Sequence, residues 1–276
     1  MLPLRDARPP RRFPIVTTLI LAVCVLAFGY ELWVLVQGGE EALNAFLERR
    51  GLVAADLVAA WQAGDYASMA TLGLVTHILL HGSWLHLFGN LLFLWIFGPN
   101  VEDRLGRLTF LALFMAGGLA AAGLQVVVDP TADLPMVGAS GAISAVLGAY
   151  LVLFPRARIQ SLVFLVFFYE LIALPSVLVL GFWFVLQLID GVASLGLTEE
   201  VAGGIAFWAH IGGFLAGVLL ALPLRFVRRP SPGLGDGVPA ALTPDAFIAA
   251  PGPVTGLPPT PPAPIAPGPP PPPSRG

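Results

Sequence analysis

The residues of this sequence best suited to chemistry are a serine set between small residues and four histidines. The serine stands in the run Gly138-Ala139-Ser140-Gly141, in which Gly138 and Gly141 allow a tight turn and the close approach of another segment. The first backbone N–H groups of a helix lack intrahelical acceptors, so a helix that begins here presents donors to a developing oxyanion. Small residues are also ordinary packing material in membrane helices, and the run alone leaves both interpretations open.

A candidate base for this serine is His210. A serine hydroxyl is a poor nucleophile until a neighbouring base takes its proton. Ala206, Gly213 and Gly217 lie at offsets of −4, +3 and +7 from His210, so the histidine shares one helix face with a stripe of small residues. His210 lies about seven residues into the last apolar stretch of the chain, and we expect it at a depth in the membrane similar to that of Ser140. The stripe therefore predicts a close helix contact that brings the imidazole within hydrogen-bond reach of Ser140.

A second group of polar residues lies in the segment that starts near His77. His86 and Asn90 are four residues apart, so both side chains share a helix face, and both can donate hydrogen bonds to an oxyanion. His77 and His81 are also four apart, a spacing that equally suits a pair of metal ligands. No cysteine or carboxylate completes such a site nearby, and we therefore expect no metal and no cofactor.

The composition places these residues in a membrane. The chain has 276 residues, of which 57% are hydrophobic and 11% charged, whereas a soluble globule has roughly a quarter charged. All 14 basic residues are arginine, which excludes Schiff-base chemistry and a Ser-Lys pair. The net charge of −3 gives no sign of nucleic-acid binding. The single cysteine, Cys24, excludes an internal disulfide.

Six apolar stretches approach the roughly 20 residues that a membrane-spanning helix needs. We therefore predict an all-α, polytopic membrane protein with six transmembrane helices. The six stretches are Ile15–Val36, Trp84–Val101, Leu108–Val128, Val137–Phe154, Ile172–Ile189 and Gly203–Val227.

The arginines orient these spans. Twelve of the 14 fall on one side of the predicted bundle, and the positive-inside rule makes that side, with both termini, cytoplasmic. Ser140 follows an acidic loop on the opposite side, so its site should open to the extracytoplasmic side. The lack of lysine and the abundance of Ala, Gly, Pro and Arg suggest a GC-rich bacterial genome and hence the plasma membrane.

Three regions follow from this pattern. Residues 1–14 form a cytoplasmic N-terminal tail, and residues 15–227 form the membrane domain, with an outer loop at 38–80 that should contain short interfacial helices. Ile159–Leu171 is apolar and is expected as an interfacial piece before the fifth span. Residues 228–276 hold 17 of the 27 prolines of the chain, all from Pro230 onward, and this composition predicts a disordered cytoplasmic tail.

Taken in order, these motifs resemble the rhomboid family of intramembrane serine proteases. The likeness covers roughly Thr71 to Leu222, and no internal repeat complicates it. The motifs that carry it are His77 and His81 leading into His86 and Asn90, Gly98-Pro99-Asn100-Val101-Glu102-Asp103-Arg104-Leu105-Gly106, Gly138-Ala139-Ser140-Gly141, and Ala209-His210-Ile211-Gly212-Gly213 with Gly217.

The resemblance implies a six-span rhomboid-like bundle that cleaves transmembrane protein substrates in or beside the bilayer. It implies Ser140 as nucleophile and His210 as base and then acid, with no acidic third member. It implies an oxyanion site of His86, Asn90 and the Ser140 N–H. Supporting roles fall to His81, which orders the first loop, to Gly138 and Gly141, and to Glu102 and Arg104, which brace the cytoplasmic end of the second span.

Two departures from the family pattern bear on this interpretation. The chain reads Leu72-Gly73-Leu74-Val75-Thr76 where many bacterial members have a Trp-Arg pair, and it has Ser144 where some place an aromatic that orients the histidine.

Glu170 is a weak candidate for a third catalytic member. Two alternatives to a protease are a catalytically silent rhomboid-like protein that binds membrane clients and a transporter of metal or solute lined by histidines.

Overall fold

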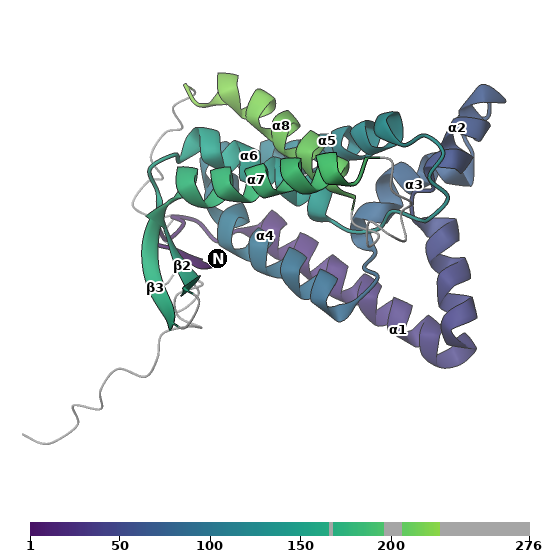
Figure 1. Ribbon diagram of the computed structural model, residues 1–276, viewed down its shortest axis with the longest axis horizontal. Coiled ribbons are helices and arrows are strands. Elements are labelled where there is room, and N and C mark those ends of the chain that lie inside the picture. The colour runs from purple at the N-terminus through teal and green to yellow at the C-terminus, as the bar shows by residue number, and fades with distance from the viewer. Residues whose placement is uncertain (166–167, 196–205, 227–276) are drawn as a thin grey trace, which may run out of the picture.

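The computed structural model describes residues 1–165, 168–195 and 206–226, which form a helical bundle with a small sheet at one end (Figure 1). Its long helices are α1 (Ile15–Arg50), α4 (Trp84–Leu105), α5 (Arg107–Val128), α6 (Ser140–Leu153), α7 (Ser176–Ala193) and α8 (Phe207–Leu224). Five of these, all but α6, are long and apolar enough to cross a membrane. The predicted tail at residues 228–276 lies outside the described residues.

The region predicted as an outer loop, residues 38–80, consists of short helices joined by turns. Helix α1 is broken at Gly39, whose φ of 72° is a left-handed conformation that glycine adopts without steric cost. The break follows the predicted end of the first span by three residues. Beyond it come the second half of α1, then α2 (Ala54–Gln62), α3 (Met69–Thr76) and the 3-10 turn η1 (His77–Leu79). Helices α2 and α3 lie at the end of the bundle opposite the sheet (Figure 1).

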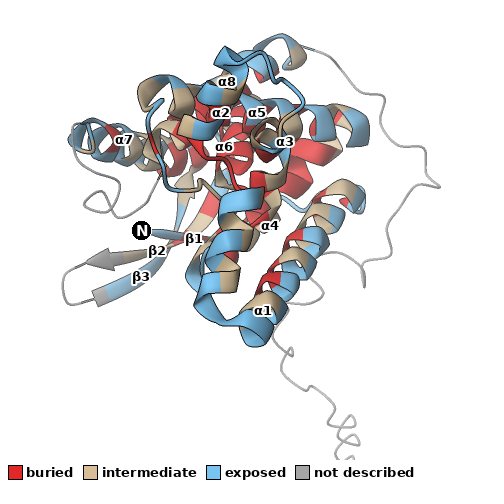
Figure 2. Cartoon of the chain, turned by 90° about the vertical axis from the view of Figure 1, so that its right-hand side faces the viewer, coloured by how far each residue is buried: buried red, intermediate tan, exposed pale blue. Residues whose placement is uncertain are grey.

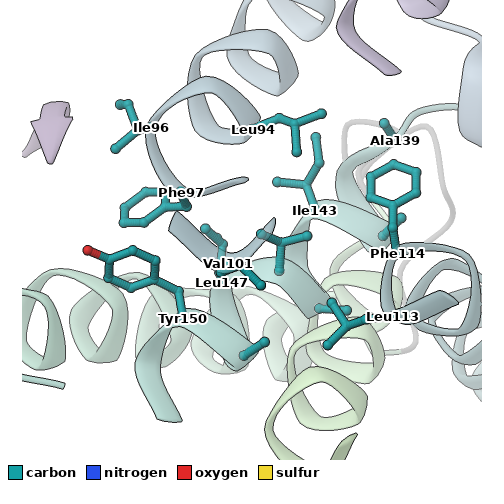
Figure 3. Packing of buried hydrophobic residues seen from close by; sticks show 14 of the residues in the cluster. Leu94, Ile96, Phe97, Val101, Leu113, Phe114, Ala139, Ile143, Leu147 and Tyr150 are labelled. Carbon is teal, nitrogen blue, oxygen red and sulfur yellow. The ribbon is translucent and has the colours of Figure 1, made fainter. Parts of the chain in front are cut away.

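Helix α6 is the centre of the bundle. Every residue from Gly141 to Tyr150 is buried, and Figure 2 shows α6 enclosed by its neighbours. Side chains from α4 and α5 meet Ile143 and Leu147 of α6 (Figure 3). With 14 residues, α6 is about 21 Å long at 1.5 Å per residue, shorter than the roughly 30 Å hydrocarbon core of a bilayer.

The prediction of an all-α fold was wrong at one end of the molecule. Strands β1 (Leu2–Asp6), β2 (Arg158–Leu165) and β3 (Phe168–Pro175) form an antiparallel sheet in the order β1-β2-β3. The expected interfacial piece at Ile159–Leu171 is therefore a pair of strands, and the N-terminal tail supplies the third. The β-branched and aromatic residues of Ile159–Leu171 favour strands. Pro175 restricts the residue before it to extended backbone, so α7 begins at Ser176 rather than at Ile172.

A buried carboxylate fixes this sheet to the bundle. Asn100 of α4 donates from Nδ2 to Asp6 (2.7 Å) and to the Arg8 carbonyl (2.9 Å), and the Tyr150 hydroxyl of α6 also donates to Asp6. Burial raises the pKa of the Asp6 carboxyl above its ordinary value, against the effect of these donors. The N-terminal segment and the segment after α6 thus meet at one end of the bundle.

Candidate active site

Ser140 is the first residue of the central helix, and the loop before it is shaped by glycine. Gly138 has a φ of 123°, which a residue with a Cβ rarely adopts. Its N–H donates to the His77 carbonyl at 2.8 Å, so the loop is fixed to η1. Because α6 starts at Ser140, the N–H groups of its first turn have no intrahelical acceptor and face the region beside the serine.

His210 of α8 contacts this serine directly. The distance from His210 Nε2 to Ser140 Oγ is 2.8 Å, a normal hydrogen bond. Both residues are half-buried. Ser140 and His210 therefore lie within hydrogen-bond reach, as expected from the sequence, and the ring nitrogen can accept the hydroxyl proton.

The close approach of α6 and α8 depends on glycines, as the small-residue stripe predicts. A Cβ on Gly213 would lie 2.0 Å from the Gly141 carbonyl oxygen, and one on Gly217 would lie 1.9 Å from the Ala145 carbonyl oxygen. A Cβ on Gly148 of α6 would likewise lie 2.1 Å from the Phe214 carbonyl oxygen. A side chain at any of these positions would push the two helices apart.

The second nitrogen of His210 also has a partner. His210 Nδ1 lies 2.7 Å from Oε1 of Gln187, which belongs to α7. Trp183, one helical turn before Gln187, packs its ring 6.1 Å from the imidazole, centroid to centroid. The position one turn after Ser140 is held by Ser144, whose hydroxyl donates to the Ser140 carbonyl at 2.7 Å. Helix α7, rather than α6, therefore supplies the groups that contact the far side of the imidazole.

His86 and Asn90 approach the same serine from α4. A Cβ on Gly138 would lie 2.5 Å from the His86 ring and 3.6 Å from Asn90 Nδ2, so both side chains face the backbone two residues before Ser140. Asn90 is 7% exposed, and its Nδ2 has no hydrogen-bond partner among the described residues. A buried amide donor left without an acceptor costs free energy, and its position suits a ligand oxygen held next to Ser140.

His81 and His77 fix the segment between α3 and α4 to neighbouring helices. The His81 backbone N–H donates to both carboxylate oxygens of Glu31 in α1, at 3.1 and 3.3 Å. The His81 ring contacts the Leu79 carbonyl through Nδ1 and lies edge-on to His86, with centroids 5.3 Å apart. His77 is bonded to a carbonyl of α3, and no group of three possible metal-binding side chains occurs in the described ranges.

Glu102 and Arg104 lie near the other end of α4. Glu102 is 3% exposed and accepts from the backbone N–H groups of Val16 and Thr17, at 3.0 and 2.8 Å. It thereby satisfies two N–H groups in the first turn of α1. Arg104 donates to the Arg225 carbonyl just after α8, at 3.0 Å. Sixteen residues separate Glu102 from His86, about 24 Å along the helix, so these contacts join helices and do not touch Ser140.

Glu170 does not approach the site. It is exposed on β3, opposite Val163 of β2. The sheet is fixed near the C-terminal end of α6 through Tyr150, whereas Ser140 is at the N-terminal end of that helix.

Three residues of the site were not singled out by sequence reasoning. Gln187 is an amide in the otherwise apolar run from Val177 to Ile189, and polar side chains in such runs are functional candidates. That rule could have found it. The same rule could have found Glu31, a carboxylate inside the predicted first span Ile15–Val36, whereas Trp183 gave no comparable signal because an aromatic residue is ordinary in a span.

The fold and its five candidate spans define an integral, mostly helical, polytopic membrane protein. The family model described as "Rhomboid domain" matches residues 69–226, more than half of the chain. The chain belongs to the rhomboid family.

Curated relatives agree with this family. Rhomboid protein 1, mitochondrial, from Saccharomyces cerevisiae is 31% identical over 161 residues, which are 56% of this chain and 42% of that protein. RHOMBOID-like protein 5 from Arabidopsis thaliana is 32% identical over 165 residues, 58% of this chain and 45% of that protein. The putative rhomboid protease YdcA from Bacillus subtilis is 38% identical over 78 residues, 28% of this chain and 39% of that protein. The chain thus spans less than half the length of each of these relatives.

Proposed function

We propose that this protein is an intramembrane serine protease that cleaves transmembrane protein substrates in or next to the membrane-spanning segment. The observation that carries the proposal is the 2.8 Å contact between His210 Nε2 and Ser140 Oγ at the start of the buried central helix. A histidine in this position can take the serine proton as the hydroxyl attacks a peptide carbonyl. The naming of one bacterial relative as a putative rhomboid protease supports the same activity.

The remaining polar groups suit the oxyanion of that reaction. As Ser140 Oγ bonds to the carbonyl carbon, the carbonyl oxygen becomes negative and requires donors. Asn90 Nδ2 and the His86 ring lie beside Gly138, two residues before Ser140, and the N–H of Ser140 itself is the third donor that we assign to the oxyanion. His210 then gives its proton to the leaving amine, and water, activated by the same histidine, hydrolyses the acyl-enzyme. In these steps the protein contributes side chains and backbone groups, and water is the second nucleophile.

The proposal includes a membrane topology. We place α6 as a sixth span, short enough that Ser140 lies below the outer surface in a site that opens to the extracytoplasmic side. Both termini are then cytoplasmic, as the positive-inside rule predicts, and the membrane is a bacterial plasma membrane. The pairing of β1 with β2 supports this arrangement, because it joins the N-terminal segment to the arginine-bearing end of α6.

Cleavage of a single-span model substrate by the purified protein in proteoliposomes tests the activity. We expect turnover by the wild type and none by Ser140→Ala. Ser144→Ala is the matched control, because it removes a hydroxyl one turn away that donates to a backbone carbonyl and should keep activity within a few-fold. Equal turnover by Ser140→Ala and wild type would show that another group carries the reaction.

A further inference from the structure

Gln187 lies on the face of α7 that packs against α8. Positions 183, 187 and 191 recur every four residues and therefore share one helix face. Trp183 contacts the rings of both His210 and Phe214, and a Cβ on Gly191 would lie 3.1 Å from Ile211 Cδ1. The stacking of Phe184 on Phe214, with centroids 4.5 Å apart, fixes the same interface. The amide of Gln187 is thus held beside the imidazole by contacts on both sides.

The Gln187 contact determines which nitrogen of the imidazole carries the proton. A carbonyl oxygen can only accept, so the 2.7 Å contact from Nδ1 to Oε1 requires a proton on Nδ1. In a neutral imidazole the other nitrogen then has a free lone pair. That nitrogen is Nε2, which faces the hydroxyl of Ser140 at 2.8 Å. Without an acceptor at Nδ1, the ring is free to take the other tautomer or to rotate, and either change removes the base from the serine.

We infer that Gln187 is a positioning residue, which holds His210 in the orientation and tautomer that accept the proton of Ser140, with Trp183 restricting the plane of the ring. The inference rests on the proposed function and extends it to α7. Gln187 acts through His210 and touches no reacting atom. Its neutral amide takes the role that an acidic residue has in a serine triad. It also takes the role of the aromatic residue that orients the histidine in some rhomboid proteins, at the position where this chain has Ser144.

Two substitutions at Gln187 distinguish the effect of the hydrogen-bond acceptor from the effect of side-chain volume. Gln187→Met keeps a similar length but removes the acceptor, whereas Gln187→Glu keeps an oxygen that can accept from Nδ1. We expect Gln187→Met to lower kcat by about 10- to 100-fold with KM within about three-fold, less than the roughly 10⁴-fold loss when the orienting carboxylate of a triad is replaced. Gln187→Glu should retain kcat within a few-fold.

Gln125→Met is the matched control. Gln125 lies on α5, and its Oε1 accepts from the backbone N–H of Ala209 at 3.2 Å, so the control loses a glutamine contact to the same turn of α8 without touching the imidazole. We expect its kcat to stay within about three-fold of wild type, even where thermal unfolding shows a lower Tm. A loss of kcat equal to that of Gln187→Met would assign both effects to the packing of α8 and overturn the inference.

The tautomer itself can be observed by ¹⁵N NMR of the histidine-labelled wild-type protein in micelles, with His210→Ala to assign the signal. We expect the proton of His210 on Nδ1, and a mixture of tautomers in Gln187→Met. A proton on Nε2 in the wild type, wild-type kcat in Gln187→Met, or an equal loss in Gln187→Glu would each overturn the role of Gln187. Failure of the proposed function is distinct from all three, since it appears as cleavage that survives Ser140→Ala.

Discussion

Gly213→Ala is predicted to inactivate the protein by separating two helices that carry the proposed catalytic pair. A Cβ at this position would lie 2.0 Å from the carbonyl oxygen of Gly141, and ordinary contact begins at 3.4 Å. Helix α8 must therefore withdraw from α6 by about 1.4 Å at this level, the difference between these two distances. This carbonyl oxygen belongs to the backbone, which cannot swing aside as a flexible side chain would.

This displacement also acts on the Ser140–His210 contact, because the Gly141–Gly213 contact lies next to it. Gly141 directly follows Ser140, and Gly213 is less than one turn beyond His210. Withdrawal by this amount would lengthen the 2.8 Å hydrogen bond to about 4 Å, beyond hydrogen-bond reach. Misplacement of about 1 Å can lower a rate on the order of 10²-fold, and overpacking of this kind costs about 1–3 kcal/mol of stability.

The assay is the initial rate of cleavage of a fluorogenic single-span substrate in micelles, measured below the Tm of each variant. Gly123→Ala on α5 is the control, since a Cβ there meets nothing within 4 Å. We expect the control to retain activity and to gain up to about 1 kcal/mol from the higher helix propensity of alanine. A folded Gly213→Ala variant that cleaves at the wild-type rate would refute the argument that glycine contact between α6 and α8 sets the distance within the pair.

Two further predictions concern the oxyanion site and the topology. Substituting His86 or Asn90 with Ala should lower kcat by on the order of 10²–10³ while changing KM little, and an effect confined to KM in the same cleavage assay would assign these residues to substrate binding instead. A cysteine at Ser140 in a Cys24→Ala background should react with a membrane-impermeant thiol reagent added to the extracytoplasmic side, whereas a cysteine at Leu151 should not. Labelling of the Ser140 position from the cytoplasmic side alone would invert the proposed topology.

The part of the site that could be predicted from the sequence is the part encoded by local spacing. The offsets of Gly213 and Gly217 from His210 define a helix face, and the structure places that face against Gly141 and Ala145. Periodicity says which residues share a face but not which helix lies opposite. The prediction of a contact with Ser140 therefore also depended on the similar depth expected for the two residues in their spans.

Contacts between distant segments were beyond this kind of reasoning. Gln187 and His210 are 23 residues apart, and Glu31 and His81 are 50 apart, so no local pattern joins them. The sheet was missed for a related reason. An apolar run such as the one from Ile159 to Leu171 suits an interfacial segment or strands equally well, and the choice is made by pairing with β1, more than 150 residues away in sequence.

The central claim is that Ser140 is a nucleophile activated by His210, and identification of the serine that reacts with a fluorophosphonate probe tests it most directly. The purified protein would be labelled in micelles, digested and analysed by mass spectrometry. We predict one adduct, on Ser140, which is absent from His210→Ala and present in Ser144→Ala, because only the first of these variants loses the base at 2.8 Å. An adduct on another serine, or labelling of Ser140 that is unchanged in His210→Ala, would contradict the claim.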